Sequence, residues 1–283
     1  MPSLAPAACS GRRDLPLRLG IVTLIDRALA TNAGNFALGN EVFGLLGATF
    51  LRDRTSPDIY DANHVADARP TTPAQIEEFL AAVDREYRAA KHRRFDVDYR
   101  TPPEFVARLT LEGYEREDGL LSLLEGELLG PPPKEFDIRP LKTEADWEAY
   151  WELMLQDWRE HIARQKRKVS DKIGRQMFDT KRLKQPPVQY FMAYVEDKPV
   201  AYFNSWAGID GVGQVEDLFT LQKFRKRGIA RALIHHCVAD ARAKGAGPVV
   251  IAADPEDTPK RIYAGMGFRP VAVHSHYTRH LDG

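Results

Sequence analysis

The sequence predicts a mixed α/β protein built from two lobes, each a mostly antiparallel sheet flanked by helices. Three observations predict this fold. In the C-terminal half, strand-like and helix-like patterns follow one another in the order βααβββαβαβ. The end of the N-terminal half repeats part of that order. Between the halves lies Gly130-Pro131-Pro132-Pro133, where three proline rings exclude both helix and central strand.

Composition indicates a soluble globular chain. Of the 283 residues, 43% are hydrophobic and 28% are charged, and no apolar run is long enough to span a membrane. The 40 basic residues balance the 40 acidic ones, which argues against a dedicated nucleic-acid-binding protein. Cys9 and Cys237 form neither a disulfide framework nor a metal-ligand set, so we expect a reducing, cytoplasmic location.

The chain is predicted to divide into four parts. Residues 1–17 are rich in Ala, Pro and Ser and lack the continuous apolar core of a secretory signal, so we interpret them as a flexible tail. The parts are the tail (1–17), a first lobe (18–130), a proline-rich linker (131–135) and a second lobe (136–283).

The second lobe is the clearer of the two. After a short alternating strand at 136–140, tryptophans recur at helical spacing, and a second helix near 170–183 ends at Pro186-Pro187. Strand patterns separated by Glu196-Asp197-Lys198-Pro199 and Asp210-Gly211 predict an antiparallel meander. The remaining elements are a helix at 228–244, a buried strand at 248–253, a helix at 259–266 and a strand at 271–276.

The first lobe is clearest at its end, where we predict helix 73–91, strand 94–97, helix 103–111 and strand 120–124. Arg108-Leu109-x-x-x-Gly113-Tyr114 matches Ile262-Tyr263-x-x-x-Gly267-Phe268 of the second lobe. In each case a helix precedes the glycine and a strand follows it. The match predicts two related lobes that arose by duplication.

The segment 215–230 carries the strongest chemical signal. A strand ends, a short loop turns, and a helix begins at Gly228, which allows close backbone approach. Unpaired amides and the helix dipole make such an N-terminus a site for pyrophosphate. Arg225, Lys226 and Arg227 add positive charge. The alternative is an ordinary helix start with a solvated charge cluster.

The pattern Arg225-x-x-Gly228-x-Ala230 resembles motif A of the GNAT superfamily of acyl-CoA-dependent N-acyltransferases. The preceding Glu-Asp-Leu-aromatic strand, the order of elements and the Tyr263 segment also fall where that family has them. The resemblance covers 136–280 and implies two GNAT-like lobes. The first lobe shows no such motif, so we expect it to bind no cofactor.

The resemblance also implies acetyl-CoA as co-substrate, with no metal. The backbone of Leu218 and Thr220 would pair with the pantetheine arm, and the Leu218 amide would face the thioester oxygen. The pyrophosphate would be held by Arg225, Lys226, Arg227, Gly228, Ile229, Ala230 and Arg231.

Glu216 is the candidate general base, because a carboxylate near the end of an apolar strand can have a raised pKa through burial. Asp217 points to the other face in a regular strand, unless a bulge turns it; it is a candidate anchor for a cationic substrate. Both are also consistent with an ordinary ion pair. Tyr263 is a candidate acid for the departing thiolate, or else a packing residue.

The resemblance, taken with Glu216 and Tyr263, implies transfer of an acetyl group from acetyl-CoA to a primary amine of a small molecule or peptide, by direct attack. The alternative is a non-catalytic sensor or scaffold that binds acyl-CoA. We expect a monomer or homodimer, and no nucleic acid or membrane as partner.

Overall fold

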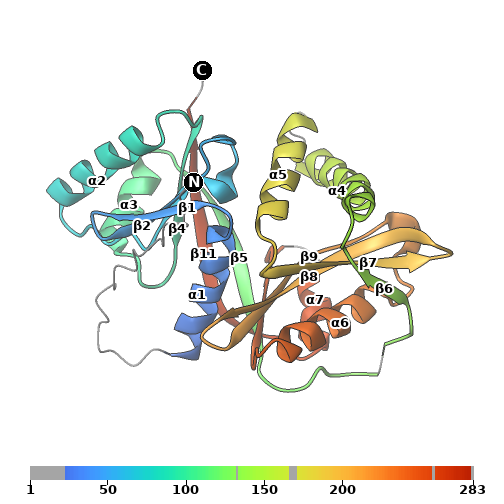
Figure 1. The fold of residues 1–283 in the computed structure, drawn as a ribbon. Coiled ribbons are helices and arrows are strands. Elements are labelled where there is room, and N and C mark those ends of the chain that lie inside the picture. Colours follow the sequence, from blue (N-terminus) through green and yellow to red (C-terminus); the bar gives the residue numbers. More distant parts are fainter. Residues whose placement is uncertain (1–22, 132, 166–170, 257–258, 282–283) are drawn as a thin grey trace, which may run out of the picture.

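A computed structural model describes residues 23–131, 133–165, 171–256 and 259–281 (Figure 1). The predicted flexible tail lies outside the described residues. One mixed sheet of 11 strands runs through both halves of the chain, in the order β1-β2-β3-β4-β11-β5-β10-β9-β8-β7-β6. The strands are β1 (Glu41–Leu45), β2 (Ala48–Arg52), β3 (His64–Ala66), β4 (His92–Val97), β5 (Glu115–Leu124), β6 (Asp137–Pro140), β7 (Val188–Val195), β8 (Lys198–Ile209), β9 (Val212–Thr220), β10 (Val249–Ala253) and β11 (Arg269–His280).

The predicted βααβββαβαβ order of the second lobe is confirmed. In the first lobe, the helix predicted at 73–91 ends at Glu86, because Tyr87 leaves the helical conformation and packs with Ala90 in the core of that lobe. The helices are α1 (Leu24–Ala37), α2 (Pro73–Glu86), α3 (Pro103–Leu111), α4 (Glu144–Gln165), α5 (Asp171–Leu183), α6 (Ile229–Ala243) and α7 (Pro259–Gly265), with short 3-10 turns η1 (Tyr60–Ala62) and η2 (Gln222–Phe224).

The two lobes exchange strands at the centre of the sheet. The last strand, β11, lies between β4 and β5 of the first lobe, and β5 lies between β11 and β10 of the second. All three of these pairings are antiparallel. The two lobes are therefore halves of one continuous sheet, and the division at 131–135 stays a prediction.

The repeated glycine segments have the same backbone geometry in both lobes. Gly113 after α3 and Gly267 after α7 have φ of 76° and 101°. The amide of the next residue reaches back into the helix in the same way: Tyr114 donates to Leu109 O at 3.1 Å, and Phe268 donates to Tyr263 O at 3.1 Å. A left-handed glycine is the usual end of a helix that turns directly into a strand.

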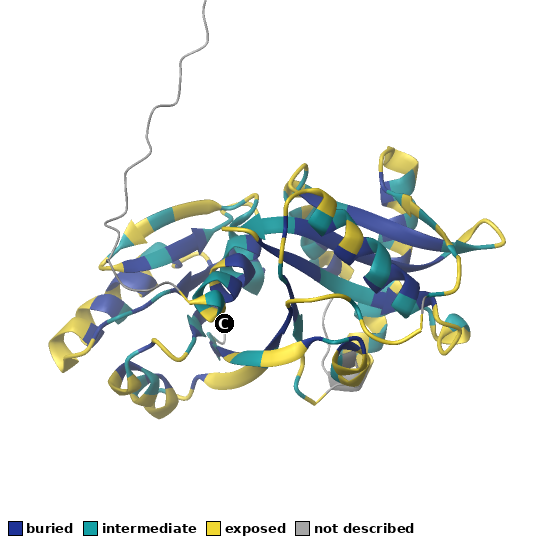
Figure 2. Ribbon diagram, turned by 90° about the horizontal axis from the view of Figure 1, so that it is seen from below, coloured by how far each residue is buried: buried dark blue, intermediate teal, exposed yellow. Residues whose placement is uncertain are grey.

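Helices cover both faces of the sheet (Figure 1). In the second lobe α6 and α7 pack on one face, and α4 and α5 on the other. In the first lobe α2 and α3 share a core with β2, β3 and β4. Helix α1 contacts β8, β9 and β10, so a first-lobe helix covers second-lobe strands. Burial is concentrated in the strands, and exposed residues lie at turns and outer helix faces (Figure 2).

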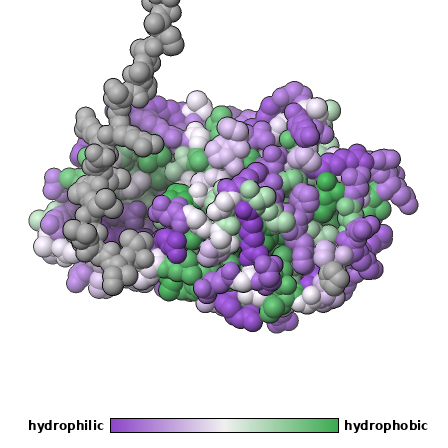
Figure 3. Space-filling view, turned by 60° about the horizontal axis from the view of Figure 1, so that its bottom comes forward, coloured by the Kyte–Doolittle hydropathy of each residue, from purple (hydrophilic) through white to green (hydrophobic). Residues whose placement is uncertain are grey.

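No helix of the described residues is long and apolar enough to cross a membrane. The face seen in Figure 3 interleaves hydrophilic and hydrophobic residues.

Candidate active site

Strands β9 and β10 separate after a very short parallel ladder. Within the described residues, only Gly213 and Gln214 of β9 pair with β10, at Val249 and Val250. Beyond Gln214, β9 keeps its partner β8 but has none on the β10 side. The separation therefore leaves backbone groups of the second half of β9 without a strand partner, a place where an extended ligand can add as a strand.

A β-bulge interrupts β9 at the start of this opening. Asn204 of β8 pairs with Glu216 and Tyr202 pairs with Phe219, so one residue of β8 faces two of β9. Asp217 supplies the extra residue, with φ of 63°. The alternative that a bulge turns Asp217 is therefore the one observed: Asp217 and Glu216 lie on the same face of the sheet.

Glu216 lies in a mostly buried polar environment, with 17% of its side chain exposed. Its Oε2 accepts from Gln214 Nε2 at 2.9 Å, and its Oε1 lies 3.7 Å from Lys184 Nζ. Burial raises the pKa of Glu216; the nearby Lys184 opposes this rise, and Asp217 reinforces it. A carboxyl group with a raised pKa is suited to accept a proton near neutral pH.

Asp217 is engaged by two partners. Its Oδ2 accepts from Lys181 Nζ at 2.5 Å and from Asn204 Nδ2 at 3.0 Å. Burial lowers the pKa of Lys181, but the nearby carboxylates of Asp217 and Glu216 raise it by more, so its pKa is raised overall. Asp217 is thus the counterion of a lysine from α5, and a cationic substrate would compete with that lysine.

The N-terminus of α6 is open. Among the described residues, the backbone N–H groups of 226–231 have no acceptor, and Gly228 has no side chain to cap them. Gly228 is exposed, with φ of 96°, and a Cβ built there has its nearest neighbours at 3.9 and 4.0 Å. These neighbours are Lys134 and Phe136, at ordinary van der Waals distance. Glycine suits the left-handed conformation, and amides without an acceptor can bind an anion.

The arginines near this helix end are held by the protein itself. Arg225 donates to Thr220 O at 2.8 Å and to Glu160 at 2.5 Å, and Arg227 donates to Lys223 O at 3.0 Å. Arg231 donates to Pro131 O at 2.9 Å and to Leu129 O at 2.5 Å. Arg225 therefore shapes the loop, and Arg231 fastens the predicted linker beside α6.

The remaining predicted cofactor-binding residues lie on β9 and at the start of α6. Leu218 packs against the α6 core, and Thr220 Oγ1 is buried without a hydrogen-bond partner among the described residues. Ile229 is buried, whereas Lys226 is exposed and Ala230 is partly exposed at the helix start. An orphaned hydroxyl and open amides fit a polar, phosphate-bearing ligand such as acetyl-CoA.

Tyr263 of α7 belongs to the core beneath α6. It is 5% exposed, and its ring lies 6.1 Å from that of Phe268. The packing role of this residue is thus visible. Its role as an acid remains a prediction. The described residues contain no group of three or more His, Cys, Asp or Glu side chains that could hold a metal ion.

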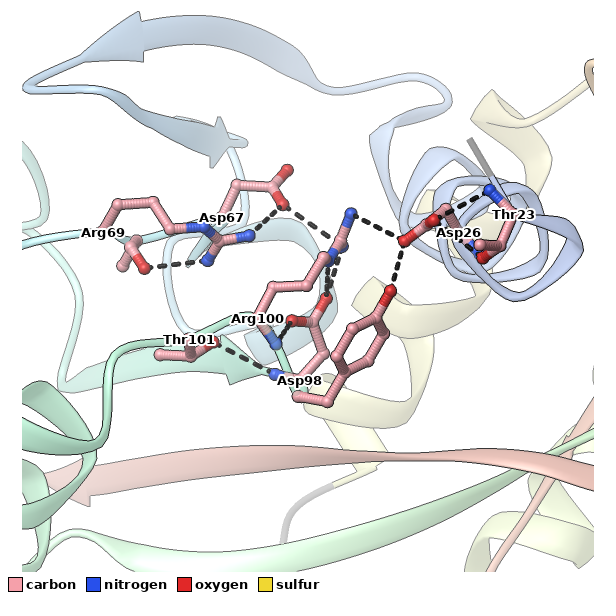
Figure 4. A network of polar contacts seen from close by, with 9 residues as sticks. Thr23, Asp26, Asp67, Arg69, Asp98, Arg100 and Thr101 are labelled. Atoms are coloured by element: carbon pink, nitrogen blue, oxygen red, sulfur yellow. Dashed lines mark hydrogen bonds and ion pairs between the residues drawn. The ribbon is translucent and has the colours of Figure 1, made fainter. Parts of the chain in front are cut away.

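The corresponding helix of the first lobe has a capped N-terminus. Strand β3 pairs in parallel with β4, but the helix that follows, α2, is capped: Thr72 accepts from the Gln75 amide, and Gln75 accepts from the Thr72 amide. Between β3 and α2, Asp67 pairs with Arg100, which also pairs with Asp98 (Figure 4). The amides of Thr72 and Gln75 thus have side-chain acceptors, whereas those of 226–231 have none among the described residues.

Sequence reasoning missed the polar residues that surround Glu216 and Asp217. They come from β8, β9, α1 and the end of α5, and no short motif joins them. These residues are Asn32, Asn35, Lys181, Lys184, Asn204 and Gln214.

The family model of the acetyltransferase (GNAT) family matches residues 147–268, which include the bulge, the opening and the α6 N-terminus. This match identifies residues 147–268 as a domain of the GNAT acetyltransferase family. No curated protein sequence matches the chain.

Solved structures resemble both halves together. A GCN5-related N-acetyltransferase from Kribbella flavida has a TM-score of 0.62 at 18% identity, over 94% of this chain and 98% of that one. A functionally unknown conserved protein from Staphylococcus epidermidis has 0.66 at 14% identity, over 86% and 95%. A tandem GNAT protein from the clavulanic acid biosynthesis pathway has 0.52 at 13% identity, over 75% and 71%. The likeness concerns the fold.

Proposed function

We propose that the protein is an acetyl-CoA-dependent N-acetyltransferase that acts on a primary amine of a small molecule or peptide. The single observation that carries the proposal is the position of Glu216. This carboxyl group has a raised pKa and stands two residues beyond the last β9–β10 pair, at the start of an opening bordered by the free amides of α6.

The position of each residue around the opening suggests its role in acetyl transfer. The amides of 226–231 would hold the pyrophosphate, and the backbone of Leu218 and Thr220 the pantetheine arm. Bound acetyl-CoA supplies an electrophilic thioester carbon. Glu216 takes the proton from the incoming ammonium, directly or through water, and frees the nitrogen lone pair. The Leu218 amide would stabilise developing negative charge, and Tyr263 would return a proton to the leaving thiolate.

Direct attack by the amine is favoured over a covalent enzyme intermediate. Cys237, a described free cysteine, is buried in the α6 core, and burial raises the pKa of its thiol far from the thiolate range. A nucleophile of this kind would need an exposed, low-pKa thiol.

The proposal is tested by measuring thiol release from acetyl-CoA with a panel of primary amines: tyramine, spermidine, glucosamine and a lysine-containing peptide. Acetylated product is confirmed by mass spectrometry. The variant Glu216→Gln should lower kcat by about 10²–10⁴-fold near neutral pH while acetyl-CoA affinity is kept. The loss should shrink toward pH 10, where the amine deprotonates unaided. Acetyl-CoA binding with background thiol release across the panel would support the sensor instead.

A further inference from the structure

Helix α1 of the first lobe is docked directly on the strands that carry the candidate base. Thr31 Oγ1 donates to Val212 O at 3.0 Å and accepts from the Ile209 amide at 3.2 Å. Thr31 is fully buried. These bonds fix the helix against the β8–β9 turn, so the residues one turn further along α1 lie over the part of β9 that leads to Glu216.

A first chain of contacts joins α1 to one oxygen of Glu216. Gln214 Nε2 lies 3.2 Å from Asn32 Oδ1 and 2.9 Å from Glu216 Oε2. Gln214 is completely buried and Asn32 is 5% exposed. A buried amide held between two acceptors has little freedom to rotate, so it fixes the direction of the carboxylate.

A second chain joins α1 to the other oxygen. Lys184 Nζ, just beyond α5, donates to Asn35 Oδ1 at 2.5 Å and lies 3.7 Å from Glu216 Oε1. Its side chain is 11% exposed, and its ammonium lies 5.5 Å from the centre of the Phe36 ring of α1. Asn35 and Phe36 thus hold the cation beside the carboxylate.

We propose that Asn32, Asn35 and Lys184 are positioning residues: through these two chains the first lobe orients the Glu216 carboxylate and sets its affinity for protons. The inference rests on the proposed function, in which Glu216 is the base. It gives the first lobe, whose corresponding helix α2 has a capped N-terminus, a part in acetyl transfer.

The charges around Glu216 determine the sign of the effect. Lys184 and Lys181 of the α5 segment favour the carboxylate, whereas burial, Asp217 of β9 and Asp61 of η1 favour the protonated acid. Without the Lys184 charge, the effects that favour the protonated acid are opposed less strongly, so the pKa of Glu216 rises further. The carboxyl group then takes up its proton at higher pH, and a larger fraction of the protein lacks a free base at pH 6.

The test compares Lys184→Met with Lys184→Arg, which keeps the charge, and with Lys172→Met, a matched control on an exposed lysine of α5. The Glu216 carboxyl carbon is titrated by ¹³C NMR in the unliganded protein and assigned by its absence in Glu216→Gln. We expect Lys184→Met to move its midpoint to higher pH and to lower kcat/KM at pH 6 roughly tenfold, with the best acceptor of the panel. Lys184→Arg and Lys172→Met should titrate like the wild type.

Asn35→Leu and Asn32→Leu extend the test to α1 itself. Both should move the Glu216 midpoint in the same direction by less than Lys184→Met does, lower kcat more than they change KM, and leave acetyl-CoA affinity within twofold. An unchanged Glu216 titration in Lys184→Met and in both asparagine variants would overturn the inference. A wild-type protein that transfers no acetyl group, with the titration shifts present, would overturn the proposed function instead.

Discussion

Asn204 of β8 stands opposite Glu216 in the ladder, yet its side-chain amide donates to Asp217 Oδ2 at 3.0 Å. Neighbouring residues of a regular strand point to opposite faces, so one side chain cannot serve both positions. The bulge at Asp217 removes this restriction. It places two carboxylates on one face, where Lys181 pairs with Asp217 and Lys184 Nζ lies 3.7 Å from Glu216 Oε1.

The raised pKa of Glu216 predicts a pH-dependent effect on stability. The folded chain binds this proton more tightly than the unfolded chain does, so the associated stability is present below the ordinary Glu pKa and is lost as pH rises through the raised value. Glu216→Gln has no such loss. Its Tm should exceed that of the wild type by about 2–4 °C at pH 8 and match it at pH 4, in calorimetric scans. Equal Tm differences at both pH values would contradict the buried, proton-binding carboxyl group.

Gly228→Glu should weaken acetyl-CoA binding strongly. The new side chain adds strain at a left-handed φ and puts negative charge on the helix end that should face pyrophosphate. Gly245→Glu is the matched control, because Gly245 lies at the other end of α6 with φ of 101° and nothing within 4 Å of a new Cβ. Calorimetry should show at least about 100-fold weaker binding for the first variant only. Similar affinities in the two variants would exclude the α6 N-terminus as the phosphate site.

Asp217→Asn should destabilise the protein even without ligand. It leaves the Lys181 ammonium, 15% exposed, without its counterion. We expect a loss of about 2 kcal/mol in urea unfolding at pH 7, because the pair is partly exposed. Asp197→Asn removes an exposed partner of Arg139 and should change stability by less than about 0.5 kcal/mol. A loss in the control equal to that in Asp217→Asn would show that the position of the pair does not matter.

Tyr99→Phe should raise the pKa of Asp26 in the network of Figure 4. The Tyr99 hydroxyl donates to Asp26 Oδ1 at 2.5 Å and, with Thr23, lowers the pKa of this carboxyl to about 2. A lowered pKa contributes stability that is present above the unfolded value and is lost as pH falls through about 2. NMR titration of Asp26 should therefore show a midpoint nearer the ordinary Asp value in the variant. An unaltered midpoint would assign the shift to the α1 cap alone.

The fold was predictable where patterns are local. The meander of β7, β8 and β9 follows from alternating strands and two-residue turns, in which Glu196, Asp197, Asp210 and Gly211 take positive φ. Helix α1 gave no clear signal, because the face it buries carries Thr31, Asn32 and Asn35 in place of a full apolar stripe. The exchange of β5 and β11 was not predicted either, since residues that pair across it are distant in sequence.

In the candidate site, too, only the residues that are close in sequence could be predicted. Glu216 and Gly228 stand in one continuous segment whose spacing is visible in the sequence. The partners of Glu216 come from separate elements, and only the folded chain brings Asn35 to Lys184. Arginine-rich spacing predicted phosphate contacts, but it cannot show that Arg225 and Arg231 already have carbonyl partners.

The place of β11 between β4 and β5 bears on how the chain is made. A ribosome releases residues 269–280 after the other described strands of the sheet, so the first lobe emerges with a gap between β4 and β5 that β11 fills later. Until β11 has emerged, the edges of β4 and β5 that it pairs with are exposed to other chains, which makes products truncated before β11 candidates for aggregation and chaperone binding.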